Sequence, residues 1–414
     1  MARERVIAAI DIGTTKVCTL VGGLGRDGET EIIGVGVSPA RGLKKGVVVD
    51  LDATVESVKA SIEKAERTSG FKIVSAFAGI SGDHIGSQNN RGVIAINHPD
   101  RVVTADDSTR VIESARAIPV AANREIIHII PRSYVIDGQD GVKNPIGMHG
   151  FRLEVETHIA TGATTSIQNL MKSINRAGVD VDDLVLQPLA SAEAVLTEEE
   201  REMGVLLADI GGGTTDIALF VDGAVWHTSC LPVGGWHLSN DIAVTLRTSF
   251  QVAEELKARY AQAQPQLVEG SEQIDIPALG DTSKRQESRR HLCEVVEARV
   301  DDILQMIVAD VKRSGYDGLL PAGIVLTGGT ANLIGIDAFA REAYRMPVRV
   351  GRPRGLRGLT DTVSDPAYAT SVGLLLWGLK AAEMDVKSAQ HGKRKGGGDI
   401  ARRLFGWARE MLPS

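Results

Sequence analysis

The chain lacks the features that would place it outside a reducing compartment. Only three of its 414 residues are cysteines, Cys18, Cys230 and Cys293, and they lie too far apart for a zinc-ligand motif or a disulfide framework. The longest weakly polar stretch, 368–379, is too short to span a bilayer. Asp11 interrupts the apolar start of the chain, which argues against a secretory signal peptide. These absences predict a cytosolic protein.

Charge is unevenly distributed along the chain. From Lys387 to Ser414 there are seven basic and two acidic residues, a net charge of +5, whereas the remaining 386 residues carry 39 basic and 51 acidic groups, a net charge of −12. An acidic body does not suit nucleic acid, so we expect no nucleic-acid partner and infer that the basic tail has a partner of its own. The length favours two or three domains.

A short motif occurs twice, about half a chain apart. VIAAIDIGTTKVCTLV at 6–21 and VLLADIGGGTTDIALFV at 205–221 each place an Asp-Ile-Gly turn between apolar, β-rich segments, and the second copy aligns with two extra glycines. The repeat predicts a strand–turn–strand element in each of two homologous halves. Strands alternate with helix-like stretches in both, which predicts an α/β fold.

Each turn has the composition of a phosphate-binding turn. Backbone amides of a tight Gly/Thr hairpin can point at phosphate oxygens, and small hydroxyl side chains add donors. Asp11 and Asp209, just before the turns, would be repelled by phosphate but suit a hydrated Mg²⁺ ion. No Gly-Lys-Ser/Thr follows, so neither is a Walker loop, and neither fits the dinucleotide fingerprint. A single turn of this kind more often has a structural role than a ligand-binding one. The presence of two copies favours a nucleotide site.

Three further segments suit the same ligand. Gln187, just before the second turn, can orient a water that attacks the γ-phosphate, or it is only a loop cap. The turn 328–330 follows a predicted strand and suits close packing against a base and its sugar. Glu254 and Lys257 share a helix face and can grip ribose hydroxyls, or they form a solvated ion pair.

Helical periodicity and turn residues organise the rest of the chain. A block at 83–162 has its own turns and is predicted to be an inserted α+β subdomain. The run 264–290 is polar, and no element is predicted there. The predicted helices are 51–69, 105–118, 164–177, 238–262, 291–313 and 367–382.

Three stretches resemble one family of the actin-like ATPase superfamily. They are REIIHIIPRSYVIDGQDGVKNPIGMHGFRLEVETHI at 124–159, RAGVDVDDLVLQPLASAEAVL at 176–196, and LLADIGGGTTDIALF continuing through LPVGGWHLSNDIAVTLRT. These strings look like the bacterial FtsA cell-division family, and the resemblance covers about residues 5–382. It implies an actin-like ATPase fold of two related halves, with a small inserted SHS2-type subdomain and a C-terminal amphipathic helix.

The resemblance also implies a division of the chain. The expected parts are 1–82 with 163–198 (first ATPase half), 83–162 (insert), 199–237 with 316–386 (core of the second half), 238–315 (its small subdomain), 387–398 (flexible linker) and 399–414 (membrane-targeting helix).

Position by position, the resemblance assigns residues to ATP and Mg²⁺. The expected catalytic or metal-holding residues are Asp11, Gln187 and Asp209, with the two aspartates acting on Mg²⁺ through water. The expected nucleotide contacts are Gly13, Thr14, Thr15 and Lys16; Gly211, Gly212, Gly213, Thr214 and Thr215; Glu254 and Lys257; and Gly328, Gly329 and Thr330.

The family's role implies partners as well. The resemblance implies a peripheral protein at the cytoplasmic face of the cell membrane, at the division septum. It would tether the ring of the tubulin-like protein FtsZ, polymerise with copies of itself and help to recruit later division proteins, with slow ATP hydrolysis at most. The interpretation places the FtsZ contact in 238–315, on a basic face near Arg285, Arg289 and Arg290. The competing interpretation of these residues is a solvated charge run.

The tail after Gly398 has the pattern of a helix that lies in a membrane surface. At about 100° per residue its bulky apolar side chains fall on one arc, and arginines lie on the remainder. Residues 393–395 are basic and precede it, which suits an anionic leaflet. The expected membrane-binding residues are Ile400, Leu404, Phe405, Trp407 and Met411 on the apolar arc and Arg402, Arg403 and Arg409 on the cationic face.

Three other readings of the same scaffold are less favoured. A sugar or acetate kinase needs an acceptor pocket with a catalytic base and has no use for the basic amphipathic tail. A pilus-assembly relative of the PilM type shares the insert but not the strings quoted above. A chaperone ATPase needs a β-rich peptide-binding domain, and none follows residue 382.

Overall fold

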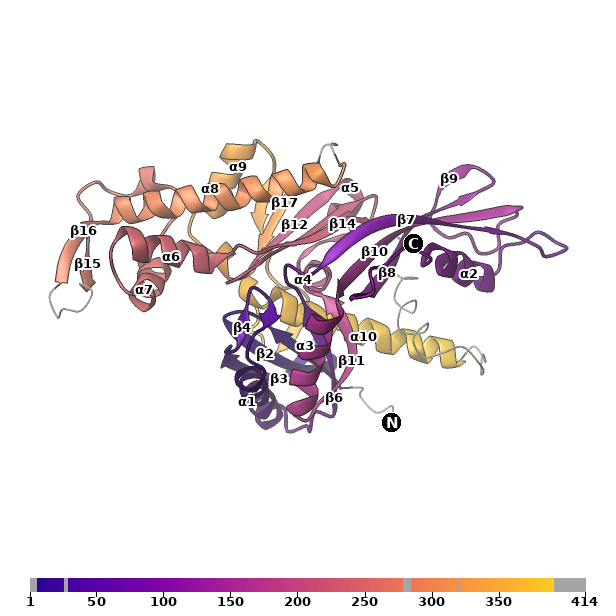
Figure 1. Ribbon diagram of the computed structural model, residues 1–414, viewed down its shortest axis with the longest axis horizontal. Coiled ribbons are helices and arrows are strands. Elements are labelled where there is room, and N and C mark those ends of the chain that lie inside the picture. The colour runs from indigo at the N-terminus through magenta and orange to yellow at the C-terminus, as the bar shows by residue number, and fades with distance from the viewer. Residues whose placement is uncertain (1–5, 26–28, 278–283, 317, 319, 391–414) are drawn as a thin grey trace.

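The computed structural model describes residues 6–25, 29–277, 284–316, 318 and 320–390. Figure 1 shows three bodies around three main sheets: the first half at the bottom, the second half above it and to the left, and the insert at the upper right.

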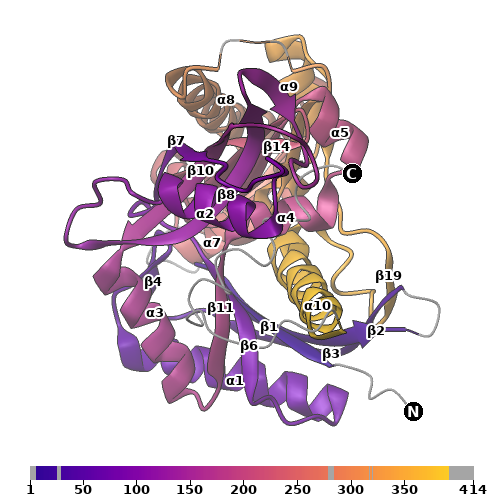
Figure 2. The ribbon, with the colours of Figure 1, turned by 90° about the vertical axis from the view of Figure 1, so that its right-hand side faces the viewer.

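The first half is a six-stranded sheet with helices on both faces. Its strand order is β11-β6-β1-β2-β3-β19. Figure 2 shows α1 below this sheet and α10 on its opposite face, where α10 packs against β1, β2 and β6. The elements are β1 (Ile7–Ile12), β2 (Lys16–Leu24), β3 (Thr30–Pro39), β4 (Leu43–Lys44), β5 (Val47–Val48), α1 (Leu51–Ser69), β6 (Ser75–Ile80), α3 (Thr164–Arg176), β11 (Asp180–Leu186), β19 (Leu356–Gly358) and α10 (Ala369–Gln390). The last two come from the stretch 316–386, which the sequence assigned to the second half, but β19 pairs with β3 and α10 packs on the first sheet.

The second half repeats the central arrangement of the first. β12 pairs antiparallel with β13 and parallel with β17, just as β1 pairs antiparallel with β2 and parallel with β6. The expected pair of related halves is therefore confirmed. The elements, in a sheet of order β14-β13-β12-β17-β18 with its helices, are β12 (Val205–Ile210), β13 (Thr215–Val221), β14 (Ala224–Leu231), β17 (Gly323–Thr327), β18 (Val348–Val350), α5 (Glu198–Met203) and α9 (Ile336–Tyr344). The helix α4 (Gln187–Val195) leads from the first half into the second and packs on α10.

The small subdomain of the second half differs from the prediction in two ways. The single helix expected at 238–262 is two helices, because Arg247 adopts a left-handed φ of 43° and Ser249 caps the next helix. The polar run at 264–290 contains a hairpin whose alternating Ile274 and Ile276 are buried. The elements are α6 (Gly235–Thr245), α7 (Phe250–Tyr260), β15 (Gln273–Pro277), β16 (Lys284–Ser288) and α8 (Arg289–Arg313).

The insert is an α+β unit with its own core, as predicted. Its four-stranded sheet has the order β7-β10-β8-β9, and α2 packs on β7 and β10. Gly92 allows this contact, since a Cβ there would overlap the carbonyl oxygen of Val111. The elements are β7 (Gly86–Ala95), α2 (Ala105–Ala115, shorter than the expected 105–118), β8 (Arg124–Ile136), β9 (Gln139–Val142) and β10 (Arg152–Ala163).

The last described helix is longer than the sequence predicted. α10 begins at Ala369, after a 3₁₀ turn at Pro366–Tyr368, and continues to Gln390. Residues 387–390, predicted as the start of a flexible linker, are therefore helical. The rest of that linker and the predicted helix at 399–414, including all its membrane-binding residues, lie outside the described residues. Within the described part of the chain, no helix is long and apolar enough to cross a membrane.

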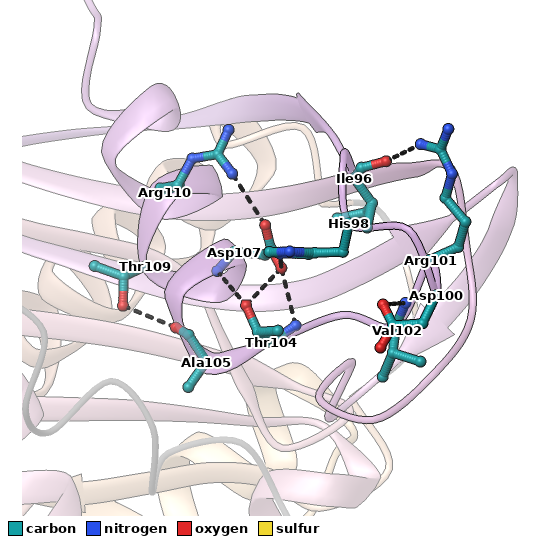
Figure 3. A network of polar contacts seen from close by, with 10 residues as sticks. All are labelled: Ile96, His98, Asp100, Arg101, Val102, Thr104, Ala105, Asp107, Thr109 and Arg110. Atoms are coloured by element: carbon teal, nitrogen blue, oxygen red, sulfur yellow. Dashed lines mark hydrogen bonds and ion pairs between the residues drawn. The ribbon is translucent and has the colours of Figure 1, made fainter.

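A polar network joins the start of α2 to the segment that precedes it (Figure 3). Asp107 is completely buried and accepts hydrogen bonds from the backbone and hydroxyl of Thr104, at 2.9 and 2.6 Å, in a capping box. His98 and Arg110 also contact its carboxylate, at 2.9 and 3.0 Å. Burial raises the pKa of Asp107, but the bonds from Thr104 and His98 outweigh that effect, so its pKa lies below the usual value.

We expect Asp107→Asn to loosen this end of the insert. The amide retains one acceptor oxygen, so buried donors lose partners and the opening free energy of α2 falls by about 2 kcal/mol. Hydrogen exchange of the amides in 105–115 measures this change. Thr109→Ala is the control, since its hydroxyl bonds only to Ala105 at the helix surface. Equal exchange in the two variants would contradict the network's role.

Candidate functional site

The two repeated turns have the same length. Asp11 pairs with Cys18 across the first hairpin, and Asp209 pairs with Asp216 across the second, so each aspartate and its partner are separated by seven positions. The sequence alignment, which gave the second turn two extra glycines, is therefore wrong. Gly212 and Gly213 occupy the positions of Thr14 and Thr15. In each turn the glycine after Asp-Ile donates its N–H to a carbonyl three residues on, at 3.0 and 2.9 Å.

The tips of the two turns meet. A Cβ on Gly212 would overlap the Cγ2 atom of Thr15, and one on Gly213 would lie 2.6 Å from Oγ1 of Thr14. The threonines of the first turn thus fill space that the second turn leaves open by having no side chains. Because both turns carry backbone amides and hydroxyls, their meeting point concentrates hydrogen-bond donors between the halves.

Asp11 and Asp209 lie behind the turns, each 7% exposed. The hydroxyls of Ser191 and Thr370 donate to Oδ2 of Asp209, at 2.5 and 2.9 Å, and the hydroxyl of Ser371 donates to Oδ2 of Asp11, at 2.8 Å. These three hydroxyl residues were missed at the sequence level. The only signal for Thr370 and Ser371 is a pair of hydroxyls at the start of an otherwise apolar helix.

Both carboxyl groups have raised pKa values. Burial raises the pKa of Asp11 to about 6, and the charge of Asp209 adds to the rise, while Lys16 and Ser371 oppose it. Burial likewise raises the pKa of Asp209, against the bonds from its two hydroxyls and the charge of Lys16. The site therefore holds two like charges in a place that water does not reach freely.

Gln187 and Lys16 are both in this site. Gln187 begins α4, and its Nε2 donates to Oδ1 of Asp11 at 3.3 Å. The Nζ of Lys16 donates to the carbonyl of Ala367 at 2.5 Å and lies 4.6 Å from the centre of the Tyr368 ring. Lys16 thus connects the first turn to the chain just before α10.

The remaining predicted residues gather beside the second turn. Lys257 pairs with Glu254 at 2.9 Å and donates to the carbonyl of Gly235 at 3.0 Å. The hydroxyl of Thr330 donates to the carbonyl of Gly211 at 3.1 Å. Gly328 has a φ of 84°, and a Cβ there would overlap Oδ1 of Asp209. Segments far apart in the sequence therefore converge on one place.

The three arginines of the predicted FtsZ contact are engaged inside the small subdomain. Arg289 donates to both carboxylate oxygens of Glu272 at 2.9 Å and to the carbonyl of Tyr260 at 2.8 Å. Arg290 donates to the carbonyl of Val268, and Arg285 to that of Leu246. Their guanidinium groups anchor the β15–β16 hairpin and neighbouring loops instead of forming a solvated charge run.

Two halves built on the same hairpin, meeting at these turns, define the actin-like ATPase fold. Solved structures with this fold resemble the chain at low identity. They include a PilM–PilN type IV pilus biogenesis complex (TM-score 0.65, 16% identity, 90% of this chain and 98% of that one), MreB5 of Spiroplasma citri bound to ADP (0.55, 15%, 94% and 99%) and a MamK double helical filament (0.52, 13%, 90% and 98%).

The sequence comparisons identify the family within that class. The model for cell division protein FtsA matches residues 206–373, and the model for the SHS2 domain inserted in FtsA matches 82–161. The cell division protein FtsA of Pseudomonas aeruginosa is 46% identical over 97% of both chains, and that of Escherichia coli K12 is 36% identical over 98% of both. The chain belongs to the FtsA family of cell-division proteins.

We expect Asp11→Asn to stabilise the fold above about pH 6. The raised pKa means that the folded state binds the proton more tightly than the unfolded state, so wild-type stability falls as pH rises from about 4 to about 6. The shift corresponds to about 3 kcal/mol, which the amide avoids. Thermal melting at pH 5 and 7.5 measures the difference, with exposed Asp52→Asn as the control. A gap between variant and wild type that does not widen with pH would contradict the buried charge.

Proposed function

We propose that the chain binds Mg-ATP between its two halves and acts in the division ring at the inner face of the cytoplasmic membrane. There it tethers FtsZ, assembles with copies of itself and helps to recruit later division proteins. The observation that carries the nucleotide assignment is the meeting of the two Asp-Ile-Gly turns, with a buried aspartate behind each. Membership of the FtsA family supports the division role.

The chemistry of the aspartate pair fits a divalent cation. Asp11 and Asp209 are held by hydroxyl donors, and within the described residues no lysine or arginine forms an ion pair with either. Lys16 reduces their repulsion, but its Nζ bonds to a carbonyl oxygen. A hydrated Mg²⁺ ion would offset the repulsion that raises the pKa of Asp11 and would favour the ionised carboxylates, whose oxygens suit that cation. Mg²⁺ would supply charge neutralisation of the β- and γ-phosphates.

The donors of the two turns fit the phosphates. The glycines at 211–213 leave backbone amides uncovered by side chains, and Thr14 and Thr15 bring hydroxyls to the same point. On this proposal Gln187, whose amide donates to Asp11, orients a water molecule beside the turns. On this proposal Glu254 and Lys257 contact the sugar, and Gly328, Gly329 and Thr330 pack against adenosine.

Two of the structural neighbours support this reading by analogy. The MreB5 neighbour holds ADP, and the MamK neighbour forms a double helical filament. We propose that this chain likewise binds an adenine nucleotide and forms filaments, with the state of the nucleotide setting how closely the halves approach.

We propose that FtsZ docks on the small subdomain, 238–315. Since Arg289 and Arg290 hold its hairpin and loops, an FtsZ peptide would compete for bonds these side chains already make. Loss of peptide binding after Arg289→Glu therefore supports a contact only if hydrogen exchange shows that β15 and β16 remain folded.

Mg-ATP binding tests the site. We expect Asp209→Ala, which removes a cation-holding carboxylate, and Gly212→Val, which places a side chain against Thr15, each to weaken binding of a fluorescent ATP analogue by at least about 100-fold. Asp52→Ala, at an exposed aspartate of α1, is the control and should bind normally. Wild-type affinity in both site variants would overturn the nucleotide assignment.

Vesicle flotation tests the tail, which we propose as the membrane anchor. Deleting 400–414 should release the protein from anionic vesicles at physiological salt, and Leu404→Glu or Trp407→Glu should do the same by placing charge on the apolar arc. Glu410→Gln, on the polar face, should float normally. Nucleotide affinity should not change in any of them. Flotation of the truncated protein would mean that the anchor lies elsewhere.

A further inference from the structure

The insert is covalently part of the first half but packs on the second. It leaves β6 at Ser81 and returns at Ala163, yet β7, β8 and β10 lie against β14, the edge strand of the second half's sheet (Figure 1). The hydroxyl of Ser87 donates to the carbonyl of Thr228 at 2.7 Å, and Nε2 of His158 lies 2.8 Å from Oγ1 of Thr228. The insert therefore straddles the two halves, and relative motion of the halves must act on it.

A second connection crosses between the halves at the root of the insert. Ser81, 5% exposed, donates its hydroxyl proton to Oδ1 of Asp216 at 2.5 Å. Asp216 lies on β13, directly after the second phosphate turn, and its Oδ2 accepts from the hydroxyl of Thr214 at 3.3 Å. Cys230, on the same strand as Thr228, lies 3.4 Å from the Ser81 hydroxyl. One carboxylate thus joins the turn to the first residues of the insert.

Asp216 depends on these hydroxyl donors. Its side chain is 4% exposed, and within the described residues no lysine or arginine pairs with it. A buried carboxylate without a cation is costly unless its oxygens accept hydrogen bonds. Burial accordingly raises the pKa of Asp216 to about 7, against the bonds from Ser81 and Thr214.

The Thr214 hydroxyl has one proton to give, so it can serve Asp216 or a phosphate oxygen but not both. The bond to Asp216 is long for an O–H donor and is the weaker of the two hydroxyl bonds that Asp216 accepts. If a phosphate takes that proton, Asp216 keeps Ser81 as its main donor, which strengthens the connection between the second half and the insert.

We propose that Ser81 and Asp216 are positioning residues that couple the second phosphate turn to the seating of the insert on β14. The coupling rests on the proposed binding of Mg-ATP. Neither residue touches the nucleotide; they act through Thr214 on one side and the start of the insert on the other. Occupancy of the turns then tightens the insert against the second half.

Hydrogen exchange of the full-length protein tests the coupling. In the wild type, Mg-ATP should slow exchange of amides in 86–95 and 224–231 by at least about threefold. Ser81→Ala should bind Mg-ATP within about threefold of the wild type but lose this slowing. Thr109→Ala removes a hydroxyl elsewhere in the insert, and it should behave as the wild type does.

Two conservative variants distinguish loss of the Ser81–Asp216 hydrogen bond from a general loss of stability. Asp216→Asn keeps an acceptor oxygen for Ser81 and should retain the slowing. Ser81→Cys keeps a weaker donor of similar size and should give an intermediate response, which carries the test if Ser81→Ala does not fold. Equal slowing with Ser, Cys and Ala at position 81 would overturn the coupling.

Two other outcomes distinguish a failure of the proposed coupling from a failure of the proposed Mg-ATP site. If the wild type binds Mg-ATP and exchange in 86–95 does not change, the coupling is wrong and the nucleotide site stands. If Mg-ATP does not bind to the wild type, the nucleotide assignment fails first, and the coupling fails with it.

Discussion

Two buried carboxylates, one behind each of the turns where the halves meet, constrain the rest of this structure. Asp11 and Asp209 repel one another, and burial denies them water, so each needs donors from elsewhere in the chain. Thr370 and Ser371, neighbours in the first turn of α10, serve one aspartate each. α10 is thereby fixed at the junction of the halves, and its apolar body covers the first sheet and α4. α10 therefore both packs in the core of the first half and supplies hydroxyl donors to Asp11 and Asp209.

The halves are similar in backbone and complementary in side chains. Their hairpins have equal lengths, but threonines at one tip face glycines at the other. Two identical turns with side chains at both tips would collide, whereas two bare turns would leave a gap. Divergence of the copies at these positions therefore lets them approach closely, and the surrounding Glu254, Lys257 and Thr330 extend the second half's side of the same junction.

Similarity of fold does not distinguish the FtsA family from the pilus protein PilM, whereas similarity of sequence does. The pilus protein PilM, one of the rival readings of the sequence, occurs in a complex that matches the chain with a TM-score of 0.65, but at 16% identity that likeness speaks only for the shared fold. Identities of 36–46% over nearly whole chains place the protein in the FtsA family. The model for the SHS2 domain inserted in FtsA matches residues 82–161, where the sequence predicted an inserted subdomain at 83–162.

Features with local causes could be predicted from the sequence alone. α1 occupies the predicted residues because Asp50 caps its start and Gly70, with a φ of 72°, ends it. The two hairpins and their aspartates follow equally from short patterns. The tertiary structure alone decided which hydroxyls hold the aspartates, since Ser371 and Asp11 are 360 residues apart in the chain. It also decided that Arg289 anchors a hairpin and that Ser81 reaches Asp216 across the halves. A sequence pattern records neighbours along the chain, whereas these contacts depend on how the two halves and the insert pack.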